Sequence, residues 1–90
     1  MKSIVFEGRT LEIYDELRLS HPKIHENLRR ILKEMRRGDP TQGLGKPEPL
    51  RHQLSGLWSR RLSITDRLIY RFDEERIYIY SILGHYEAVH

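Results

Sequence analysis

Residues 45–61 of the chain are GKPEPLRHQLSGLWSRR, and the rest of the sequence is organised around this stretch. It begins as a stiff loop, because Pro47 and Pro49 fix the backbone angle φ and bias the residues before them towards extended geometry. It ends as an alternating strand that contains Trp58 and two adjacent arginines. A carboxylate, Glu48, on a stiff loop beside several cations favours phosphate chemistry over a role in packing alone.

The N-terminal half of the chain predicts one strand followed by two helices. Residues 2–7 are rich in β-branched and aromatic side chains, as is typical of a strand. From residue 10 to about residue 19, leucine and tyrosine recur at helical spacing. Pro22 suits the first turn of a second helix, and Gly38 suits its end. The apolar positions of that helix form one stripe: Ile24, Leu28, Ile31, Leu32 and Met35.

A loop and three strands are predicted for the C-terminal half. The loop, residues 39–49, is rich in proline and glycine, and a loop of that length in a small domain is usually functional or mobile. Residues 57–64 and 67–72 alternate, whereas residues 76–83 are nearly continuously apolar, as expected of a central strand. The order β-α-α-β-β-β predicts a single α+β domain over residues 1–90, with two helices packed on a twisted antiparallel sheet.

Composition limits the class of protein. With 38% hydrophobic and 32% charged residues, the chain suits a soluble globular domain, and no apolar run is long enough for a bilayer span. The sequence contains no cysteine, which excludes disulfides and thiolate metal sites and fits a reducing compartment. These features predict a cytoplasmic protein that does not bind membranes.

The positive charge is concentrated in one segment. The net charge of the whole chain is +3, yet residues 46–71 alone have a net charge of +4 and the remainder has −1. A local basic surface of this kind favours a phosphate-bearing or acidic partner. The alternative is a solvated face that keeps the protein soluble, which would need no such concentration.

Three arginines fall on the polar phase of two neighbouring strands: Arg61, Arg67 and Arg71. Their side chains are expected to converge on one surface, where opposed like charges are destabilising unless a counterion or ligand lies between them. Alternatively, each arginine extends into water from a solvated sheet face. The residues alone leave both interpretations open.

A histidine side chain can give and take a proton near neutral pH. The strongest candidate for this role is His85, because it follows the last strand and precedes Tyr86. A lone histidine more often packs or lies exposed at a chain end. Its combination with a carboxylate, several arginines and a tyrosine favours catalysis. His21 and His25 have a spacing that could hold a metal, but no third ligand accompanies them, so surface histidines are the better interpretation. No metal and no cofactor is predicted.

The motifs of the C-terminal half also occur together in a known family. They are KPEPL at 46–50 followed by His52, LSGLWSRR at 54–61, RLIY at 67–70 and HY at 85–86. In these residues and their spacing the chain resembles the YoeB/Txe toxins of the RelE superfamily. The N-terminal forty residues match that family in pattern only.

The resemblance implies the RelE-like small bacterial RNase fold and the toxin of a type II toxin–antitoxin pair. Such toxins are metal-independent endoribonucleases that cleave messenger RNA, mostly on the translating ribosome, and so inhibit translation. The RNA 2′-hydroxyl attacks its own phosphorus and leaves a 2′,3′-cyclic phosphate. The implied partners are a Phd/YefM-type antitoxin, the ribosome with its mRNA, and operator DNA through the antitoxin complex. Homodimerisation is implied by some relatives.

Four residues of this chain match the catalytic positions of that family. The resemblance implies that Glu48 is the general base on the 2′-hydroxyl and that His85 is the general acid for the leaving oxygen. Arg67 would stabilise charge on the scissile phosphate, and Tyr86 would orient the substrate or stack on it. An acid, a base and a cation are also what such a transesterification needs chemically.

Three further residues match positions that contact phosphate. Lys46 and Arg61 would position the RNA backbone. Arg51 stands where family members commonly have lysine, so a guanidinium fork replaces a flexible point charge. The rival hypothesis is a catalytically silent module of the same fold that binds antitoxin, operator DNA or ribosomal RNA without cutting it.

Overall fold

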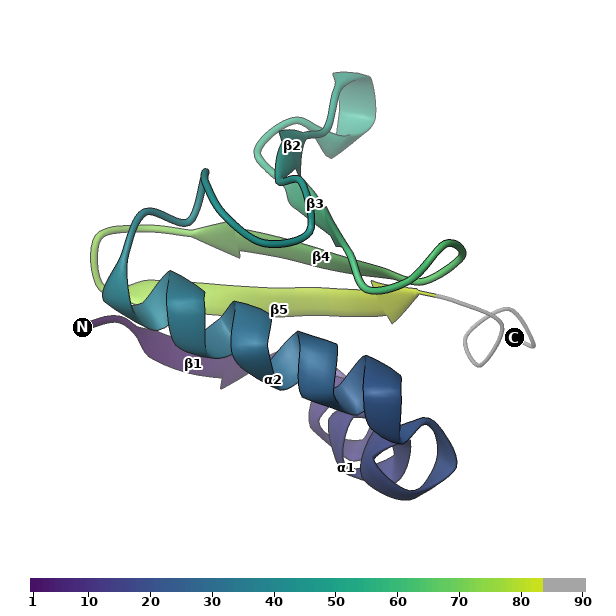
Figure 1. The fold of residues 1–90 in the computed structure, drawn as a ribbon. Coiled ribbons are helices and arrows are strands. Elements are labelled where there is room, and N and C mark those ends of the chain that lie inside the picture. The colour runs from purple at the N-terminus through teal and green to yellow at the C-terminus, as the bar shows by residue number, and fades with distance from the viewer. Residues whose placement is uncertain (84–90) are drawn as a thin grey trace.

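The computed structural model describes residues 1–83, and its elements follow the predicted order (Figure 1). The predicted α+β class with two helices packed on a sheet is confirmed. One short strand is added at Glu48–Pro49, inside the segment predicted as a loop. The elements are β1 (Ser3–Phe6), α1 (Thr10–Ser20), α2 (Pro22–Arg37), β2 (Glu48–Pro49), the 3-10 helix η1 (His52–Leu54), β3 (Trp58–Arg61), β4 (Arg67–Phe72) and β5 (Arg76–Leu83).

The sheet is mixed, so the prediction of a wholly antiparallel sheet is wrong in one pair. The strand order is β1-β5-β4-β3-β2, and β1 pairs with β5 in parallel. The amide of Lys2 donates to the carbonyl of Arg36 at 3.1 Å, so α2 ends beside the start of β1. The strands β3, β4 and β5 form an antiparallel meander, and β5 lies between β4 and β1.

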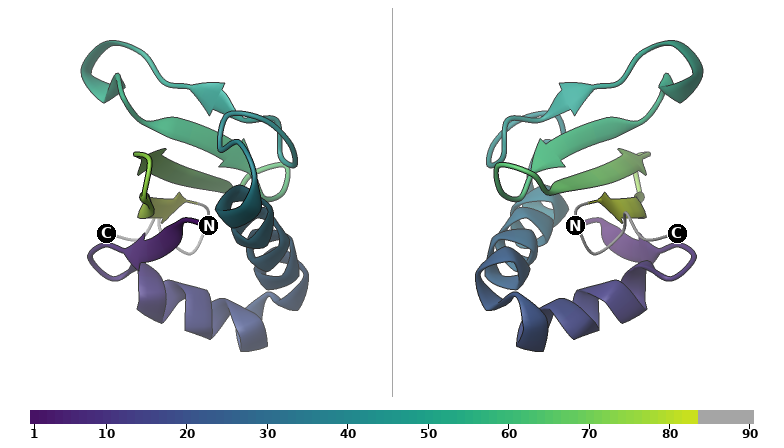
Figure 2. Two further views of the ribbon diagram at one scale, coloured as in Figure 1. Left: turned by 90° about the vertical axis from the view of Figure 1, so that its left-hand side faces the viewer. Right: turned by 90° about the vertical axis from the view of Figure 1, so that its right-hand side faces the viewer.

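Both helices cover the same face of the sheet (Figures 1 and 2). The predicted stripe on α2 is confirmed, because Leu28 and Met35 are completely buried and the stripe packs against the sheet. Each such side chain stabilises the fold by roughly 1.5–3 kcal/mol through burial. No helix of the described residues is long and apolar enough to cross a membrane. Within residues 1–83 no helix lies on the opposite face of the sheet.

The strand predicted at residues 57–64 ends earlier, at Arg61. A tight turn replaces its last part, because the amides of Leu62 and Ser63 donate to the carbonyl of Asp66 at 2.8 and 3.3 Å. The Ser63 hydroxyl also bonds to the Asp66 carboxylate and accepts from the Asp66 amide. Ile64 at the tip of this turn is 98% exposed. The turn leads directly into β4 and fixes where that strand begins.

Candidate active site

Strand register brings three predicted site residues to the sheet face opposite the helices. Arg61 on β3 pairs directly with Arg67 at the start of β4. Glu48 on β2 pairs with Ser59, which lies two residues before Arg61 on β3. Paired residues, and residues two apart on one strand, share a face, so Glu48 and Arg61 are diagonal neighbours at about 7–8 Å. One carboxylate and two guanidinium groups thus occupy adjacent positions.

Lys46 joins this group through the backbone. The Arg61 amide donates to the Gly45 carbonyl at 2.7 Å, so the residues that precede Glu48 run alongside the end of β3. Lys46, Glu48 and Arg61 are exposed, and Arg67 is half-buried. Within residues 1–83 none of these four forms an ion pair. Cations outnumber the carboxylate in this group, which favours an anionic ligand.

Arg71 does not belong to the group, although the sequence placed it on the same surface. It lies four residues along β4 from Arg67, about 13 Å at the usual rise of a strand. Its guanidinium carbon lies 3.9 Å from the centroid of the Tyr78 ring, and its Nη2 lies 3.8 Å from Glu7 Oε1. The predicted convergence of three arginines therefore holds for Arg61 and Arg67 only.

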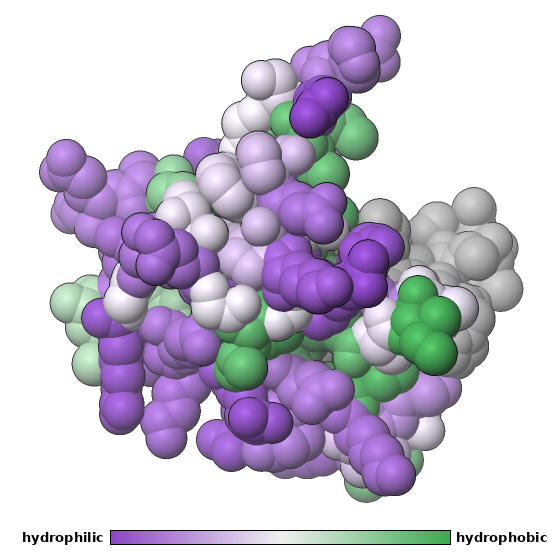
Figure 3. Space-filling model, turned by 45° about the horizontal axis from the view of Figure 1, so that its top comes forward, coloured by the Kyte–Doolittle hydropathy of each residue, from purple (hydrophilic) through white to green (hydrophobic). Residues whose placement is uncertain are grey.

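Of the remaining predicted residues, the structure describes only Arg51, which lies away from the group. Arg51 is exposed and follows β2, where the Leu50 amide donates to the Leu57 carbonyl at 2.8 Å. This end of the hairpin is opposite to Arg61 and projects from the body of the molecule (Figure 1). The molecular surface on the face drawn in Figure 3 is largely hydrophilic. His85 and Tyr86 lie outside the described residues.

Sequence reasoning missed the part that Arg60 plays, because it counted this arginine among the surface cations of residues 46–71. Arg60 is completely buried, and its Nη1 lies 2.8 Å from Glu34 Oε1. A signal was present in the sequence, since Arg60 alternates in phase with the apolar residues Trp58 and Leu62. Its charge is neutralised inside the molecule and does not add to the exposed basic surface.

His21 precedes α2 and His25 lies on it, and the described structure offers them no metal site. Within residues 1–83 no three histidine, aspartate or glutamate side chains are placed to hold a metal ion. The ring of His25 instead packs against Tyr14, with 4.6 Å between the ring centroids.

The arrangement suits a phosphodiester substrate. Two guanidinium groups side by side can hold phosphate oxygens, to which arginine is well matched in geometry and charge. Glu48 lies beside them as a carboxylate that can accept a proton from a neighbouring hydroxyl.

Comparisons with known proteins show which family and which solved structures the chain is similar to. Residues 6–86 match the family model described as the YoeB-like toxin of bacterial type II toxin–antitoxin systems. The toxin YoeB of Streptomyces coelicolor is 37% identical over 83 residues, which cover 92% of this chain and 98% of that protein. The YoeB–YefM complex from Staphylococcus aureus contains a chain with a TM-score of 0.84 and 32% identity, covering 96% of this chain and 99% of that one. A YoeB dimer from the same species gives a TM-score of 0.83 at 33% identity, with 94% and 98% covered.

Proposed function

The chain belongs to the YoeB-like toxins of bacterial type II toxin–antitoxin systems, and from this premise we propose that it is a metal-independent endoribonuclease that cleaves messenger RNA on the ribosome. The observation that supports this proposal most strongly is the register of β2, β3 and β4. It places Glu48 diagonal to Arg61 and places Arg61 opposite Arg67, on a sheet face that no described helix covers. Such a face offers a proton acceptor and two phosphate ligands to one stretch of RNA.

The proposed reaction is an internal transesterification of RNA. Glu48 removes the proton from a 2′-hydroxyl, and the oxygen forms a bond to the adjacent phosphorus. The bond from that phosphorus to the 5′-oxygen breaks, and His85 gives this oxygen a proton. The products are a 2′,3′-cyclic phosphate and a 5′-hydroxyl, so the atoms balance without added water. Arg67 stabilises the negative charge that builds on the phosphate, and removing one such group typically lowers the rate by about 10²–10³-fold.

The other site residues bind and orient the RNA in this proposal. Lys46 and Arg61 hold backbone phosphates next to the reacting one, since both lie at the end of β3 beside Glu48. Tyr86 orients the substrate or stacks on a base. Arg51 contacts a phosphate farther away, because it lies at the opposite end of the β2–β3 hairpin.

The proposed partners follow from the relatives. An antitoxin of the Phd/YefM type binds the chain, by analogy with the YoeB–YefM complex from Staphylococcus aureus. The antitoxin complex binds operator DNA. A homodimer is proposed by analogy with the YoeB dimer of the same species.

Cleavage of RNA by purified protein tests the proposal. The chain is incubated with messenger RNA on translating ribosomes, the RNA is then extracted, and its ends are analysed chemically. A parallel reaction with RNA alone is run in EDTA. Glu48→Gln is expected to lower the rate by about 10²–10⁴-fold, because it removes the base. Glu75→Gln, at an exposed glutamate in the turn after β4, is the control and is expected to retain the wild-type rate.

The possible results separate the hypotheses. A 2′,3′-cyclic phosphate that depends on Glu48 supports the enzyme. Ribosome or RNA binding without cleavage favours the catalytically silent module. Undiminished cleavage by Glu48→Gln would remove this residue from the mechanism, and cleavage of RNA that stops in EDTA would contradict metal independence.

A further inference from the structure

Arg60 is a charged side chain held entirely inside the molecule. It is completely buried on β3, whereas its neighbour Arg61 is exposed. Arginine keeps its proton in proteins, so the interior must accommodate a cation. The loss of hydration is unfavourable unless an opposite charge and a full set of hydrogen bonds compensate for it. The residues around Arg60 are therefore arranged to satisfy its guanidinium group.

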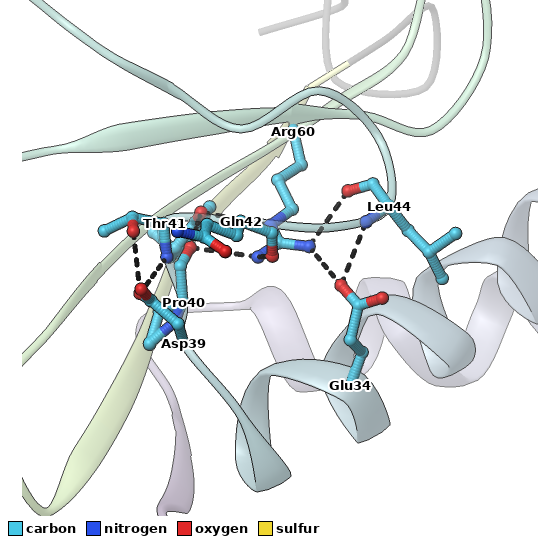
Figure 4. A network of polar contacts seen from close by, with 8 residues as sticks. Glu34, Asp39, Pro40, Thr41, Gln42, Leu44 and Arg60 are labelled. Carbon is cyan, nitrogen blue, oxygen red and sulfur yellow. Dashed lines mark hydrogen bonds and ion pairs between the residues drawn. The ribbon is translucent and has the colours of Figure 1, made fainter.

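Most of the guanidinium's hydrogen bonds go to one loop (Figure 4). Its Nη1 donates to Glu34 Oε1 at 2.8 Å and to the carbonyl of Leu44 at 2.9 Å. Its Nη2 donates to the carbonyls of Pro40 and Gln42 at 2.9 and 2.8 Å. Three alternate residues of the loop between α2 and β2 thus turn their carbonyl oxygens towards one cation.

Two side chains complete the network. The Nε of Arg60 donates to the Tyr70 hydroxyl at 3.1 Å, so all five N–H groups of the guanidinium are used. The Tyr70 hydroxyl in turn donates to the Pro40 carbonyl at 2.6 Å. Glu34 Oε1 also accepts from the Leu44 amide at 2.9 Å, so Leu44 is held through both its N–H and its C=O. The loop is consequently bound at several points to α2, β3 and β4.

These contacts lie immediately before the proposed catalytic carboxylate. One residue after Leu44, the Gly45 carbonyl accepts from the Arg61 amide at 2.7 Å. Glu48 then enters β2 and pairs with Ser59. No helix or strand precedes β2 in this loop, so the path of the backbone from residue 39 to residue 47 depends on these bonds.

We propose that Arg60 is a positioning residue, which with Glu34 clamps residues 40–44 and thereby fixes Lys46 and Glu48 relative to Arg61 and Arg67. Arg60 does not touch RNA, because it is completely buried. Arg60 acts through the loop, and its effect on catalysis rests on the proposed function. Two adjacent arginines of the same strand therefore have different tasks: one binds the substrate, and the other holds the loop that supplies the base.

Hydrogen exchange tests the clamp independently of any activity. Arg60→Lys keeps the charge but removes two of the five N–H donors and the planar fork. The Leu44 and Arg61 amides are expected to exchange at least about tenfold faster in this variant, because the hydrogen bonds that hold the loop are weakened. Amides in the middle of β5 are expected to stay at the wild-type rate. The control is Arg29→Lys, an exposed arginine of α2 that also forms two hydrogen bonds to a glutamate.

A second variant protects the test against a general loss of folding. Glu34→Gln keeps the shape and one acceptor oxygen of the side chain but removes the charge opposite Arg60. It is expected to accelerate exchange at the same two amides, in the loop and at the end of β3. Acceleration spread evenly over the chain in both variants, or none at Leu44 and Arg61 in either, would overturn the clamp.

Cleavage kinetics test whether the clamp acts through Glu48. Arg60→Lys is expected to lower kcat by about 10–100-fold with KM nearly unchanged, since a small displacement of a catalytic group has effects of this order. In the Glu48→Gln background the same substitution is expected to lower kcat less than about threefold, because the positioned group is already lost. Equal factors in both backgrounds would reduce Arg60 to a structural role. Absence of cleavage by the wild type would refute the proposed function, while the exchange results would still decide the clamp.

Discussion

Gly45→Ala tests the close approach of the loop to β3, which sets the position of Glu48. Gly45 has a φ of +78°, a conformation that residues with a side chain rarely adopt. A Cβ atom at this position would lie 2.7 Å from the Arg61 carbonyl oxygen and 3.2 Å from the Arg61 amide nitrogen. Both are backbone atoms, so no rotation of a side chain can relieve the clash. The same glycine accepts the 2.7 Å hydrogen bond from the Arg61 amide.

The expected loss of stability has two parts. The left-handed backbone costs about 1–2 kcal/mol for alanine. The displaced loop also loses a main-chain hydrogen bond, with a net cost of about 0.5–1.5 kcal/mol. Together they lower the free energy of unfolding by about 1.5–3.5 kcal/mol. In a domain of this size each kcal/mol shifts Tm by about 4–8 °C, so a decrease of about 6–28 °C is expected.

Thermal unfolding followed by circular dichroism measures this decrease. Gly8→Ala is the matched control, because Gly8 has a φ of +57° and a Cβ there would meet nothing within 4 Å. The Gly8→Ala variant loses only the free energy of the left-handed backbone conformation. Its Tm is expected to fall by about half as much as the Tm of Gly45→Ala. Equal decreases in the two variants would refute the packing of the loop against β3.

Two further predictions concern stability and pH. Tyr70→Phe is expected to lower the free energy of unfolding by about 1–2 kcal/mol in urea, because the 2.6 Å hydrogen bond to the Pro40 carbonyl is lost. Burial raises the pKa of Tyr70. The contribution of Tyr70 to stability is therefore complete below the ordinary tyrosine pKa of about 10, and it is lost as the pH rises through the native pKa. The Tyr70→Phe variant should not show this loss of stability at alkaline pH. Hydrogen bonds from the backbone N–H groups of Glu75 and Arg76 lower the pKa of Asp73, so its contribution is present above the ordinary aspartate pKa of about 3.9 and is lost as pH falls through the native value. Asp73→Asn should therefore flatten the acid side of the stability curve measured by urea unfolding, and an unchanged acid side would contradict this account.

The sequence predicted those parts of the fold that depend on local periodicity. The stripe on α2 predicted the burial of Leu28 and Met35, since one face of an amphipathic helix must meet the core. Register and direction are long-range properties, and the parallel pairing of Ser3 with Arg76 left no local signal. The early end of β3 was missed because the bonds between Ser63 and Asp66 outweigh a favourable alternation.

The sequence predicted which residues belong to the candidate site, but it could not predict how these residues are arranged in space. The motif identified Glu48, Arg61 and Arg67, and the register of three strands was needed to place them side by side. The alternation of β3 was the one signal in the sequence for the burial of Arg60. The groups that make this burial possible, Glu34 and the loop carbonyls, lie far away in the sequence and could not be predicted. The roles of His85 and Tyr86 remain predictions from the resemblance.

The parallel pair of β1 and β5 has a consequence for synthesis of the chain. Ser3 pairs with Arg76, so the first strand to leave the ribosome waits for the last one before it gains a partner. At about 5–20 residues per second this wait is on the order of 4–15 s, during which the edge of β1 is open to wrong pairings. The sheet that displays Glu48, Arg61 and Arg67 is likewise incomplete until β5 docks between β1 and β4. We therefore expect the complete sheet to form only after residues 76–83 have been synthesised.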